Sequence, residues 1–390
     1  MNEHGWVAST HQTVEWVPDD DRAWRRHGTI QLDAVIPPEI AHIAFAVPSD
    51  IAAATAQADA ALARLDIELA GVNPHALDAA SAHLIRAESI SSSRIEGLDL
   101  SARRLAEADF DSTTAKRLAR EVASNVRAMR HAIELGASQR PITAQHVAAL
   151  HAELMAGVPF IHGGEYRTTQ NWIGATNNPA DATYVPPPPA EVARLIDDVA
   201  LFANRTDLSP TLQAAIAHAQ FEGIHPFVDG NGRVGRCLIG VIIRQRSGLT
   251  VFPPVSAGLR RDTDGYFRDL HAYQQQSNPW PWARRFATVA VEACTTARHL
   301  VTDIEALQAD WHTRAGKPRR GSITARLIEF LPAHTITDAN ELANLLGVDP
   351  NVARRGLAAL EAVGIVNEVA GKRRNRVWRA DEMHTLLDSI

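Results

Sequence analysis

Residues 225–236 read HPFVDGNGRVGR, and the segments on either side have helical patterns. A helix predicted over 211–223 ends just before this stretch, and an apolar helix over 234–246 follows it. Gly230 and Gly232 let the backbone approach a ligand closely and turn its N–H groups toward it. The helix that follows adds the positive end of its dipole. The stretch therefore predicts an anion-binding loop between two helices.

The charged side chains of this loop extend the same prediction. Arg233 and Arg236 are three residues apart, so on a helix both guanidinium groups lie on one face and can reach one polyphosphate. Asp229 is placed to hold a Mg²⁺ ion that bridges phosphates. His225, at the entrance of the loop, could accept the proton of an attacking hydroxyl. A plain glycine turn between helices would not account for these four side chains together.

The rest of the chain up to residue 310 predicts a nearly all-α protein. Residues 1–47 are expected to be loop-like, and 157–189, rich in Gly, Asn and Pro, a functional loop or hairpin. Thr143 is a plausible N-cap. Helical spacing of apolar residues and helix-ending signals predict helices over 51–70, 77–90, 105–135, 146–156, 190–202, 263–275 and 280–310.

The last part of the chain has a different pattern. Residues 317–379 hold eleven Lys and Arg against six Asp and Glu, a local balance of +5. After a hinge at 317–321, three helical patterns (322–331, 340–346, 350–363) precede two short strands around a basic turn at 371–374. Three helices and a basic hairpin are the pattern of a winged helix-turn-helix.

Composition excludes several classes of protein. The chain has 390 residues, 45% of them apolar, with a net charge of −6, so it is neither disordered nor a general polyanion binder. Cys237 and Cys294 are far apart and fit no zinc or disulfide pattern. The N-terminus does not resemble a signal peptide, and apolar runs are too short to cross a membrane. We expect a cytoplasmic protein without a membrane partner.

The motif HxFx(D/E)GNGRxxR at 225–236 resembles the signature of the Fic family of protein adenylyltransferases. The resemblance implies that His225 is the general base and that Asp229 binds Mg²⁺. Phe227 would be a core anchor. It also implies contacts with ATP, mainly with its phosphates, by the following residues: Gly230, Asn231, Gly232, Arg233, Val234, Gly235 and Arg236. A related phosphotransferase branch has a lysine after the asparagine; Gly232 stands there, which favours AMP transfer over phosphorylation.

Two other segments match features of the same family. Ser92 to Gly97 fits the pattern (S/T)xxxE(G/N) of an inhibitory segment, in which Glu96 would pair with Arg236 and block the γ-phosphate, with Ser92 steadying Glu96. Residues 174–186 resemble the flap hairpin that registers a target segment by main-chain hydrogen bonds. Tyr266 lies where the family often has a tyrosine near the adenine pocket. Either Tyr266 contacts adenine or it is a core residue.

The fold expected from these observations is mainly α: a Fic helical core with a β-hairpin flap and a small C-terminal winged helix domain. Its expected divisions are an N-terminal helical region (1–110) with inhibitory segment 92–97, a catalytic core (111–312) and a winged helix (317–380).

The expected activity is transfer of AMP from ATP to a Ser, Thr or Tyr hydroxyl of a target protein, with release of pyrophosphate, under autoinhibition by Glu96. ATP and Mg²⁺ are the expected substrate and cofactor. Self-modification, a homodimer and DNA binding stay open. Two alternatives also stay open, a nucleotide-sensing transcription regulator that binds DNA and an enzyme that removes AMP with the same residues.

Overall fold

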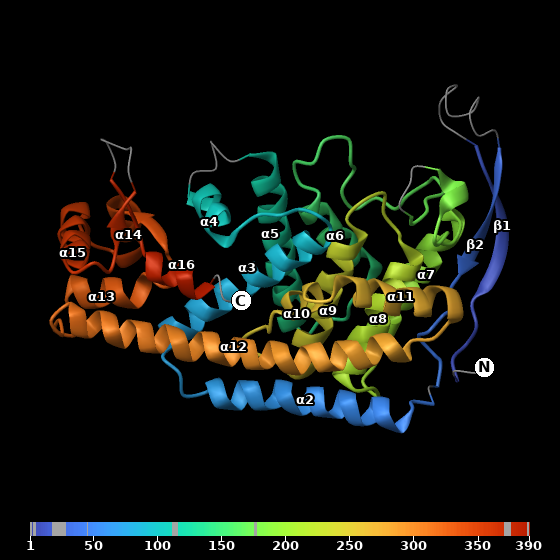
Figure 1. Cartoon of the computed structure of the whole chain (residues 1–390), viewed down its shortest axis with the longest axis horizontal. Helices are drawn as coiled ribbons and strands as arrows, with labels where there is room; N and C mark the ends of the chain where they lie inside the picture. Colours follow the sequence, from blue (N-terminus) through green and yellow to red (C-terminus); the bar gives the residue numbers. More distant parts are fainter. Residues whose placement is uncertain are drawn as a thin grey trace. The chain divides into compact units, whose positions relative to one another are not determined.

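The computed structural model describes residues 2, 5–17, 29–44, 46–110, 116–174, 178–369, 376–387 and 390, and the fold is mainly helical with two small sheets (Figure 1). Its main helices are α2 (Ser49–Leu69), α3 (Pro74–Ile95), α4 (Ala102–Phe110), α5 (Arg117–Ala137), α6 (Ala144–Leu154), α7 (Pro189–Ala203), α8 (Pro210–Ile224), α9 (Asn231–Ser247), α10 (Val255–Arg260), α11 (Thr263–Gln276), α12 (Trp280–Arg314), α13 (Ile323–Phe330), α14 (Ala339–Leu346), α15 (Pro350–Ala362) and α16 (Asp381–Leu387). Within the described part of the chain, no helix is both long and apolar enough to span a bilayer.

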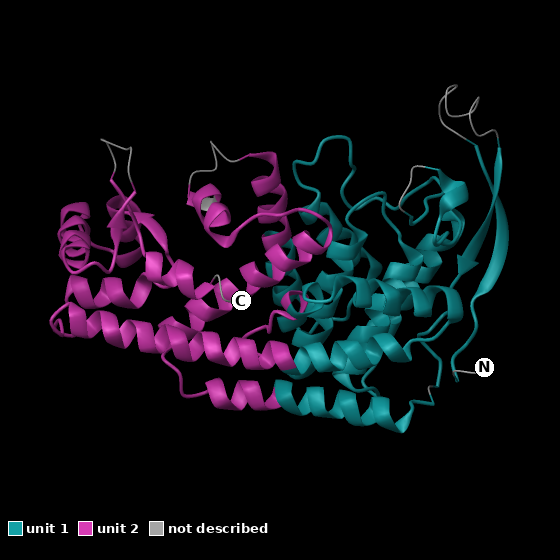
Figure 2. Cartoon of the chain, in the orientation of Figure 1, with its two compact units in different colours: residues 1–62, 127–248, 258–291 teal, residues 63–126, 249–257, 292–390 magenta. Residues whose placement is uncertain are grey.

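The chain forms two compact units, each assembled from separated segments (Figure 2). Unit 1 contains residues 1–62, 127–248 and 258–291, and unit 2 contains 63–126, 249–257 and 292–390. Helices α2, α5, α10 and α12 contribute residues to both units.

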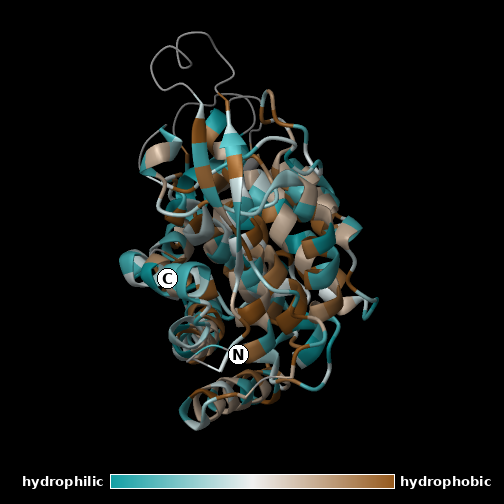
Figure 3. Ribbon diagram, turned by 90° about the vertical axis from the view of Figure 1, so that its right-hand side faces the viewer, coloured by the Kyte–Doolittle hydropathy of each residue, from teal (hydrophilic) through white to brown (hydrophobic). Residues whose placement is uncertain are grey.

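The expectation of a loop-like N-terminus is wrong, because residues 10–36 contain an antiparallel hairpin. Strand β1 (Thr10–Trp16) pairs with β2 (Ile30–Ile36), with Thr10 opposite Ile36 and Trp16 opposite Ile30. Apolar and polar residues follow one another along the strands (Figure 3), the alternation of a sheet with one buried face. Trp16 packs edge-on against Trp172, with ring centroids 5.6 Å apart.

Two other tryptophans, Trp6 and Trp24, lie near the N-terminus in the sequence. Trp6 is buried between Tyr273 and Trp280. Trp24 lies outside the described residues.

Helices α8 and α9 form the centre of unit 1. Every residue of α8 after Pro210 is buried, and its N-terminus is capped by the Ser209 side chain, which accepts the Leu212 N–H, with Pro210 at the first helical position. Helix α9 buries most of its residues and ends at Gly248 in the left-handed conformation. The two helices are packed against each other and joined by residues 225–230.

The single helix expected over 105–135 is divided. Helix α4 ends at Phe110 and α5 starts at Arg117, and residues 111–115 lie outside the described part of the chain. Thr143 caps α6 as expected, its hydroxyl accepting the His146 N–H while the His146 ring accepts the Thr143 N–H. His146 therefore takes the place of the Glu or Gln of an ordinary capping box.

In unit 2, helices α13, α14 and α15 are followed by the expected pair of strands, β4 (Asn367–Glu368) and β5 (Val377–Arg379). The sequence did not reveal strand β3 (Ile336–Asp338), which pairs with the other edge of β5 and completes a sheet of order β3-β5-β4. It also did not reveal α16. The basic turn residues Lys372, Arg373 and Arg374 lie outside the described residues.

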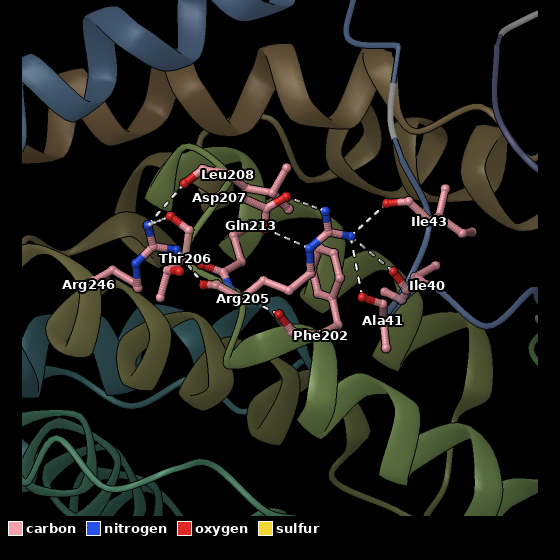
Figure 4. A network of polar contacts seen from close by, with 10 residues as sticks. All are labelled: Ile40, Ala41, Ile43, Phe202, Arg205, Thr206, Asp207, Leu208, Gln213 and Arg246. Carbon is pink, nitrogen blue, oxygen red and sulfur yellow. Dashed lines mark hydrogen bonds and ion pairs between the residues drawn. The ribbon is translucent and has the colours of Figure 1, made fainter.

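Two arginines tie the turn between α7 and α8 together (Figure 4). The Arg205 guanidinium donates to the carbonyl oxygens of residues 40, 41 and 43, closest at Ile43 (2.7 Å), and to both carboxylate oxygens of Asp207. The Arg246 guanidinium donates to the carbonyl oxygens of Arg205, Thr206 and Leu208 and to Gln213 Oε1. Arg205 thereby joins the segment before α2 to the start of α8.

The Arg205→Ala variant should lose about 2–4 kcal/mol of unfolding free energy, because it removes charged donors from several carbonyl oxygens at once. Urea denaturation measures this. The control is Arg194→Ala, which removes an exposed arginine paired with Glu39 and Glu191 and should cost less than about 1 kcal/mol. Equal losses of unfolding free energy in the two variants would show that the Arg205 contacts stabilise the protein no more than an exposed ion pair does.

Candidate active site

His225 is the residue at which α8 ends. Its backbone is in the left-handed conformation (φ 49°, ψ 62°), which is uncommon outside glycine, and its N–H donates to the Phe221 carbonyl oxygen at 2.9 Å. Pro226 follows and has no N–H with which to continue the helix. The chain therefore leaves α8 abruptly at the expected base.

A buried arginine holds this helix end. The Arg167 guanidinium, in a side chain that is only 3% exposed, donates to the carbonyl oxygens of His225 (2.9 Å), Pro187 (2.5 Å), Ile224 (3.4 Å) and Thr169 (3.3 Å). Its backbone N–H also donates to the Pro226 carbonyl oxygen at 2.9 Å. A cation is favourable here because the last carbonyls of a helix carry partial negative charge. The sequence analysis did not reveal this role of Arg167.

Two asparagine amides hold the His225 ring. Asn171 Nδ2 lies 2.9 Å and Asn231 Nδ2 lies 3.1 Å from His225 Nδ1. The Asn231 amide is oriented by the Phe227 backbone, whose N–H donates to Oδ1 and whose carbonyl accepts from Nδ2. No residue that the structure describes hydrogen-bonds Nε2, so this nitrogen is the one left for a substrate.

The loop between the helices is anchored by Phe227 and His151. Phe227 is fully buried, as expected, and its ring stacks on the His151 ring with centroids 3.7 Å apart. His151 Nδ1 accepts the Gly164 N–H at 2.9 Å, so Nε2 carries the proton and donates to the Asp229 carbonyl oxygen at 3.1 Å. His151 is thus a structural residue of the site, and its place on α6 gave no signal of this in the sequence.

Gly230 begins α9 in a conformation that only glycine adopts easily. Its φ is 80°, and a Cβ here would lie 2.2 Å from Met155 Cε. The backbone N–H groups of the first turn, from Asn231 onward, then lie at a helix N-terminus, the arrangement that binds anions. The Asn231 side chain, expected to contact phosphate, is occupied by Phe227 and His225. The Val234 side chain is in the core, so only its backbone could reach a nucleotide.

The Arg233 side chain gives the strongest structural indication that this site binds a ligand. Its side chain is 5% exposed, yet Nε and Nη1 have no hydrogen-bond partner among the described residues. Only Nη2 approaches a carboxylate, Asp229 Oδ1, at 3.5 Å. Buried guanidinium donors without acceptors cost free energy, so this arrangement favours an anionic ligand.

Arg236 and Gly235 lie deeper in unit 1. The Arg236 side chain is 1% exposed, and Nη1 donates to the Tyr266 hydroxyl at 3.2 Å. A Cβ on Gly235 would lie 2.9 Å from both Glu222 Oε1 and His218 Nδ1. Gly235 therefore has a packing reason to be glycine, the close approach of α8 and α9. Tyr266 is buried, which fits the second of its two expected roles, a core residue. Its contact with adenine stays a prediction.

Asp229 is suited to a metal ion that a nucleotide also binds. Its carboxylate is 55% exposed, and Oδ1 accepts the Gly230 N–H at 2.6 Å. Among the described residues, no three His, Cys, Asp or Glu side chains gather into a metal site. A single exposed carboxylate fits Mg²⁺, which is commonly held by one or two carboxylates together with substrate phosphates.

Part of the expected flap is present. Ile173 and Tyr184 form a β-bridge, and the Tyr184 hydroxyl donates to the Gly223 carbonyl oxygen at 2.8 Å, which ties the base of the flap to α8. Trp172 packs against the N-terminal hairpin rather than standing free. Residues 175–177 lie outside the described part of the chain.

The expected inhibitory segment is the end of α3 in unit 2. Glu96 is the exposed C-cap residue, with its N–H donating to the Ser93 carbonyl oxygen, and Gly97 follows with φ 79°. Ser92 is buried. The Asn125 amide holds this part of the helix by donating to the Ser89 carbonyl oxygen and to Ser93 Oγ.

Burial keeps the His225 ring neutral. Desolvation and, second, the Arg167 charge lower the pKa of His225 to about 4, while the Asp229 charge acts in the opposite direction. A neutral imidazole at pH 7 can accept a proton, which a general base must do.

His225 should therefore stay neutral down to about pH 5, and Asp229→Asn should lower its pKa further, because a nearby negative charge is removed. NMR of the imidazole resonances measures both. The His218 resonance is the internal control, because its low pKa comes from burial and the Arg236 charge. A His225 pKa near the ordinary 6.5 in the wild type would contradict the burial argument.

Comparison with known proteins agrees with this geometry. Residues 141–243 match the Fic/DOC family model and 52–134 match the model of the Fic/DOC family N-terminal region. The protein adenylyltransferase Fic of Drosophila grimshawi is 36% identical over 117 residues, and that of Drosophila melanogaster is 35% identical over 117 residues. Each match covers 29% of this chain but only 22% and 21% of the respective relative, so the chain spans about a fifth of those proteins.

Solved structures share the fold. A Fic family protein from Desulfovibrio desulfuricans superposes with a TM-score of 0.55 at 22% identity, covering 86% of this chain and 97% of that one. Fic-1 from C. elegans (residues 134–508) superposes with a TM-score of 0.53 at 22% identity, covering 65% of this chain and 74% of that one. The fold class is confirmed as a mainly helical Fic fold with small sheets. The chain therefore contains a Fic/DOC domain preceded by a Fic/DOC N-terminal region, with distant homology to the Fic protein adenylyltransferases.

Proposed function

We propose that the protein transfers AMP from ATP to a Ser, Thr or Tyr hydroxyl of a target protein and releases pyrophosphate. The observation that carries the proposal is Arg233, a buried guanidinium with two unpartnered donors next to a helix N-terminus. The His225 ring, the Asp229 carboxylate and the Gly230 turn supply the base, the metal ligand and the backbone anion site. The Fic adenylyltransferase relatives support the same reaction.

In the proposed reaction, His225 accepts the proton of the target hydroxyl. The hydroxyl oxygen bonds to the α-phosphorus as the bond from that phosphorus to the β-phosphate bridging oxygen breaks, and pyrophosphate leaves. Arg233, the α9 N-terminus and Arg236 would stabilise the charge on the phosphates. Mg²⁺, held by Asp229, would neutralise phosphate charge. Gly232, in place of the phosphotransferase lysine, favours the α-phosphate as the site of attack.

Because both asparagine Nδ2 atoms lie against Nδ1, the His225 ring proton is on Nε2, and a base at Nε2 requires one further change, which we propose occurs at Asn171. For Nε2 to accept a proton, the ring's own proton must be on Nδ1 and needs an acceptor there. Asn171 Oδ1 is buried and has no hydrogen-bond partner among the described residues. A turn of the Asn171 amide would place this oxygen where Nδ2 now lies, 2.9 Å from Nδ1. Asn171 is thus proposed to orient the base.

We also propose that Glu96 restrains the activity, on the strength of its match to the inhibitory pattern. A carboxylate that engages Arg236 would compete with the γ-phosphate for the same donors. The same carboxylate could instead position a water for removal of AMP, so the reverse reaction is an outcome of the test rather than a separate site. Modification of the chain itself is included in the proposal.

The test is incubation of wild type, Glu96→Gly and His225→Ala with ATP and Mg²⁺, alone and with host lysate, followed by intact mass and gel analysis. We expect adenylylation in Glu96→Gly, little in wild type and at least about a hundredfold less in His225→Ala, because removing a base costs about 10²–10⁴ in rate. His271→Ala, which changes a half-buried histidine of α11, is the matched control. Full activity of His225→Ala would refute the proposed base.

A second candidate function is DNA binding by the C-terminal helices, in a nucleotide-sensing regulator. Helix α15 exposes Asn351, Arg354 and Arg355 at its N-terminal end, where a recognition helix contacts bases. Against this, Arg376 is paired with Glu361 and Glu368 and stacks on Trp378. The proposal that residues 317–380 form a winged helix domain is part of this second candidate function.

If α15 binds DNA, the binding constant should fall steeply with salt, with a slope near −0.9 in log–log form for each neutralised phosphate. The Arg354→Ala/Arg355→Ala variant should reduce the slope by about two. Fluorescence anisotropy with duplex DNA at several salt concentrations measures this, and Arg319→Ala/Arg320→Ala is the control for general basic charge. Equal slopes in all three proteins would exclude α15 as the DNA contact.

A further inference from the structure

A buried chain of hydrogen bonds in unit 1 ends on Arg236. Arg236 Nη1 lies 3.2 Å from the Tyr266 hydroxyl, which in turn lies 2.9 Å from His218 Nε2. All three side chains are at most 1% exposed. They come from three different helices, so these hydrogen bonds link α11 to the α8–α9 pair.

Donor and acceptor roles in this chain follow from simple chemistry. Arginine can only donate, so the Tyr266 oxygen accepts from Arg236. The phenol proton can donate to His218 Nε2 when the neutral His218 ring carries its own proton on Nδ1. Burial and the Arg236 charge lower the pKa of His218 to about 3, so its ring is neutral at pH 7.

The surroundings hold Tyr266 in place. Its ring contacts Trp282 edge-on at 5.3 Å and Phe267 at 5.1 Å, and Trp282 Nε1 donates to the Ala215 carbonyl oxygen in α8 at 2.7 Å. Gly235 leaves room for the His218 ring, since a Cβ there would lie 2.9 Å from His218 Nδ1. A hydroxyl on such a rigid ring can orient a flexible arginine at little further entropy cost.

We propose that Tyr266 is a positioning residue for Arg236, held in turn by His218, rather than a contact for the adenine ring. The inference rests on the proposed function, in which Arg236 binds the terminal phosphates of ATP. The Tyr266 hydroxyl holds Nη1 and so helps to fix the orientation in which the guanidinium meets the terminal phosphates. Tyr266 thereby favours a triphosphate through Arg236 and does not read the base.

The test is a double-mutant cycle on nucleotide affinity, measured by calorimetry with ATP and ADP at constant Mg²⁺. Tyr266→Phe should weaken ATP binding about three- to tenfold and ADP binding less. In the Arg236→Ala background, the same substitution should have almost no further effect. GTP should lose affinity by the same factor as ATP, because the base is not involved.

The matched control is Tyr273→Phe. Tyr273 is also a buried tyrosine of α11, but its hydroxyl donates to Gln220 Oε1, whereas the Tyr266 hydroxyl accepts from Arg236. This variant should keep its ATP affinity within about twofold. An equal loss in Arg236→Ala and wild-type backgrounds, or a loss for ATP but not for GTP, would overturn the inference and restore Tyr266 to the adenine site.

A measurement without nucleotide separates this inference from the proposed function. In ¹⁵N NMR spectra, rotation of the Arg236 guanidinium should be slow in wild type and Tyr273→Phe and faster in Tyr266→Phe. Slow rotation in wild type, together with no ATP binding by wild type or by Glu96→Gly, would refute the proposed function and keep the hydrogen-bond chain. Unchanged rotation in Tyr266→Phe would refute the chain, whether or not ATP binds.

Discussion

The candidate site depends on one buried cation, Arg167. Its guanidinium and backbone N–H bind five carbonyl oxygens, three of them from residues 224–226, where α8 ends. The His225 carbonyl oxygen has a second, longer donor in Asn171 Nδ2, and a buried carbonyl that lost its donor would cost about 1–3 kcal/mol. With Arg167 present, the chain can leave α8 at His225 in a left-handed conformation and still satisfy its backbone. The direction of the His225 ring, the burial of Phe227 and the turn at Gly230 all follow from this exit.

Burial shapes the chemistry of the site in two opposite ways. It lowers the pKa of His225 and keeps that ring neutral, as a base requires. It also leaves Arg233 with buried donors that no described residue satisfies, so the site favours the binding of an anion. Keeping these donors ready for phosphate therefore lowers the free energy of unfolding. The same low-dielectric surroundings strengthen each phosphate contact. Proteins commonly accept such local costs where they function.

The sequence predicted most of the helices and the loop that joins α8 to α9, because helical spacing and the glycine pattern are local signals. Thr143, Phe227 and the α8–α9 pair were placed correctly. The β1–β2 hairpin was missed because the segment between the strands, residues 17–29, is long and rich in charged residues. The turns that mark a hairpin in a sequence are short. Strand β3 was missed because three residues carry no periodicity.

The residues that support the site could not be found in the same way. Arg167, His151 and Asn171 act on the motif from 54 or more residues away in sequence, and only the fold brings them to it. Tyr266 was considered, but its partner His218 was expected only to be a core histidine. Gly235 had been assigned to the nucleotide, whereas packing against His218 and Glu222 gives it a local reason. Long-range hydrogen bonds leave no pattern in a single sequence.

The central claim is that the loop at 225–236 delivers the α-phosphate of ATP to a hydroxyl. The most direct measurement supplies the Glu96→Gly protein and host lysate with ATP labelled either at the α- or at the γ-phosphate. The account predicts that label from the α-phosphate becomes covalently attached to protein, in the chain or in a target, and that label from the γ-phosphate leaves in pyrophosphate. Protein labelled from the γ-phosphate, or from neither position, would contradict it.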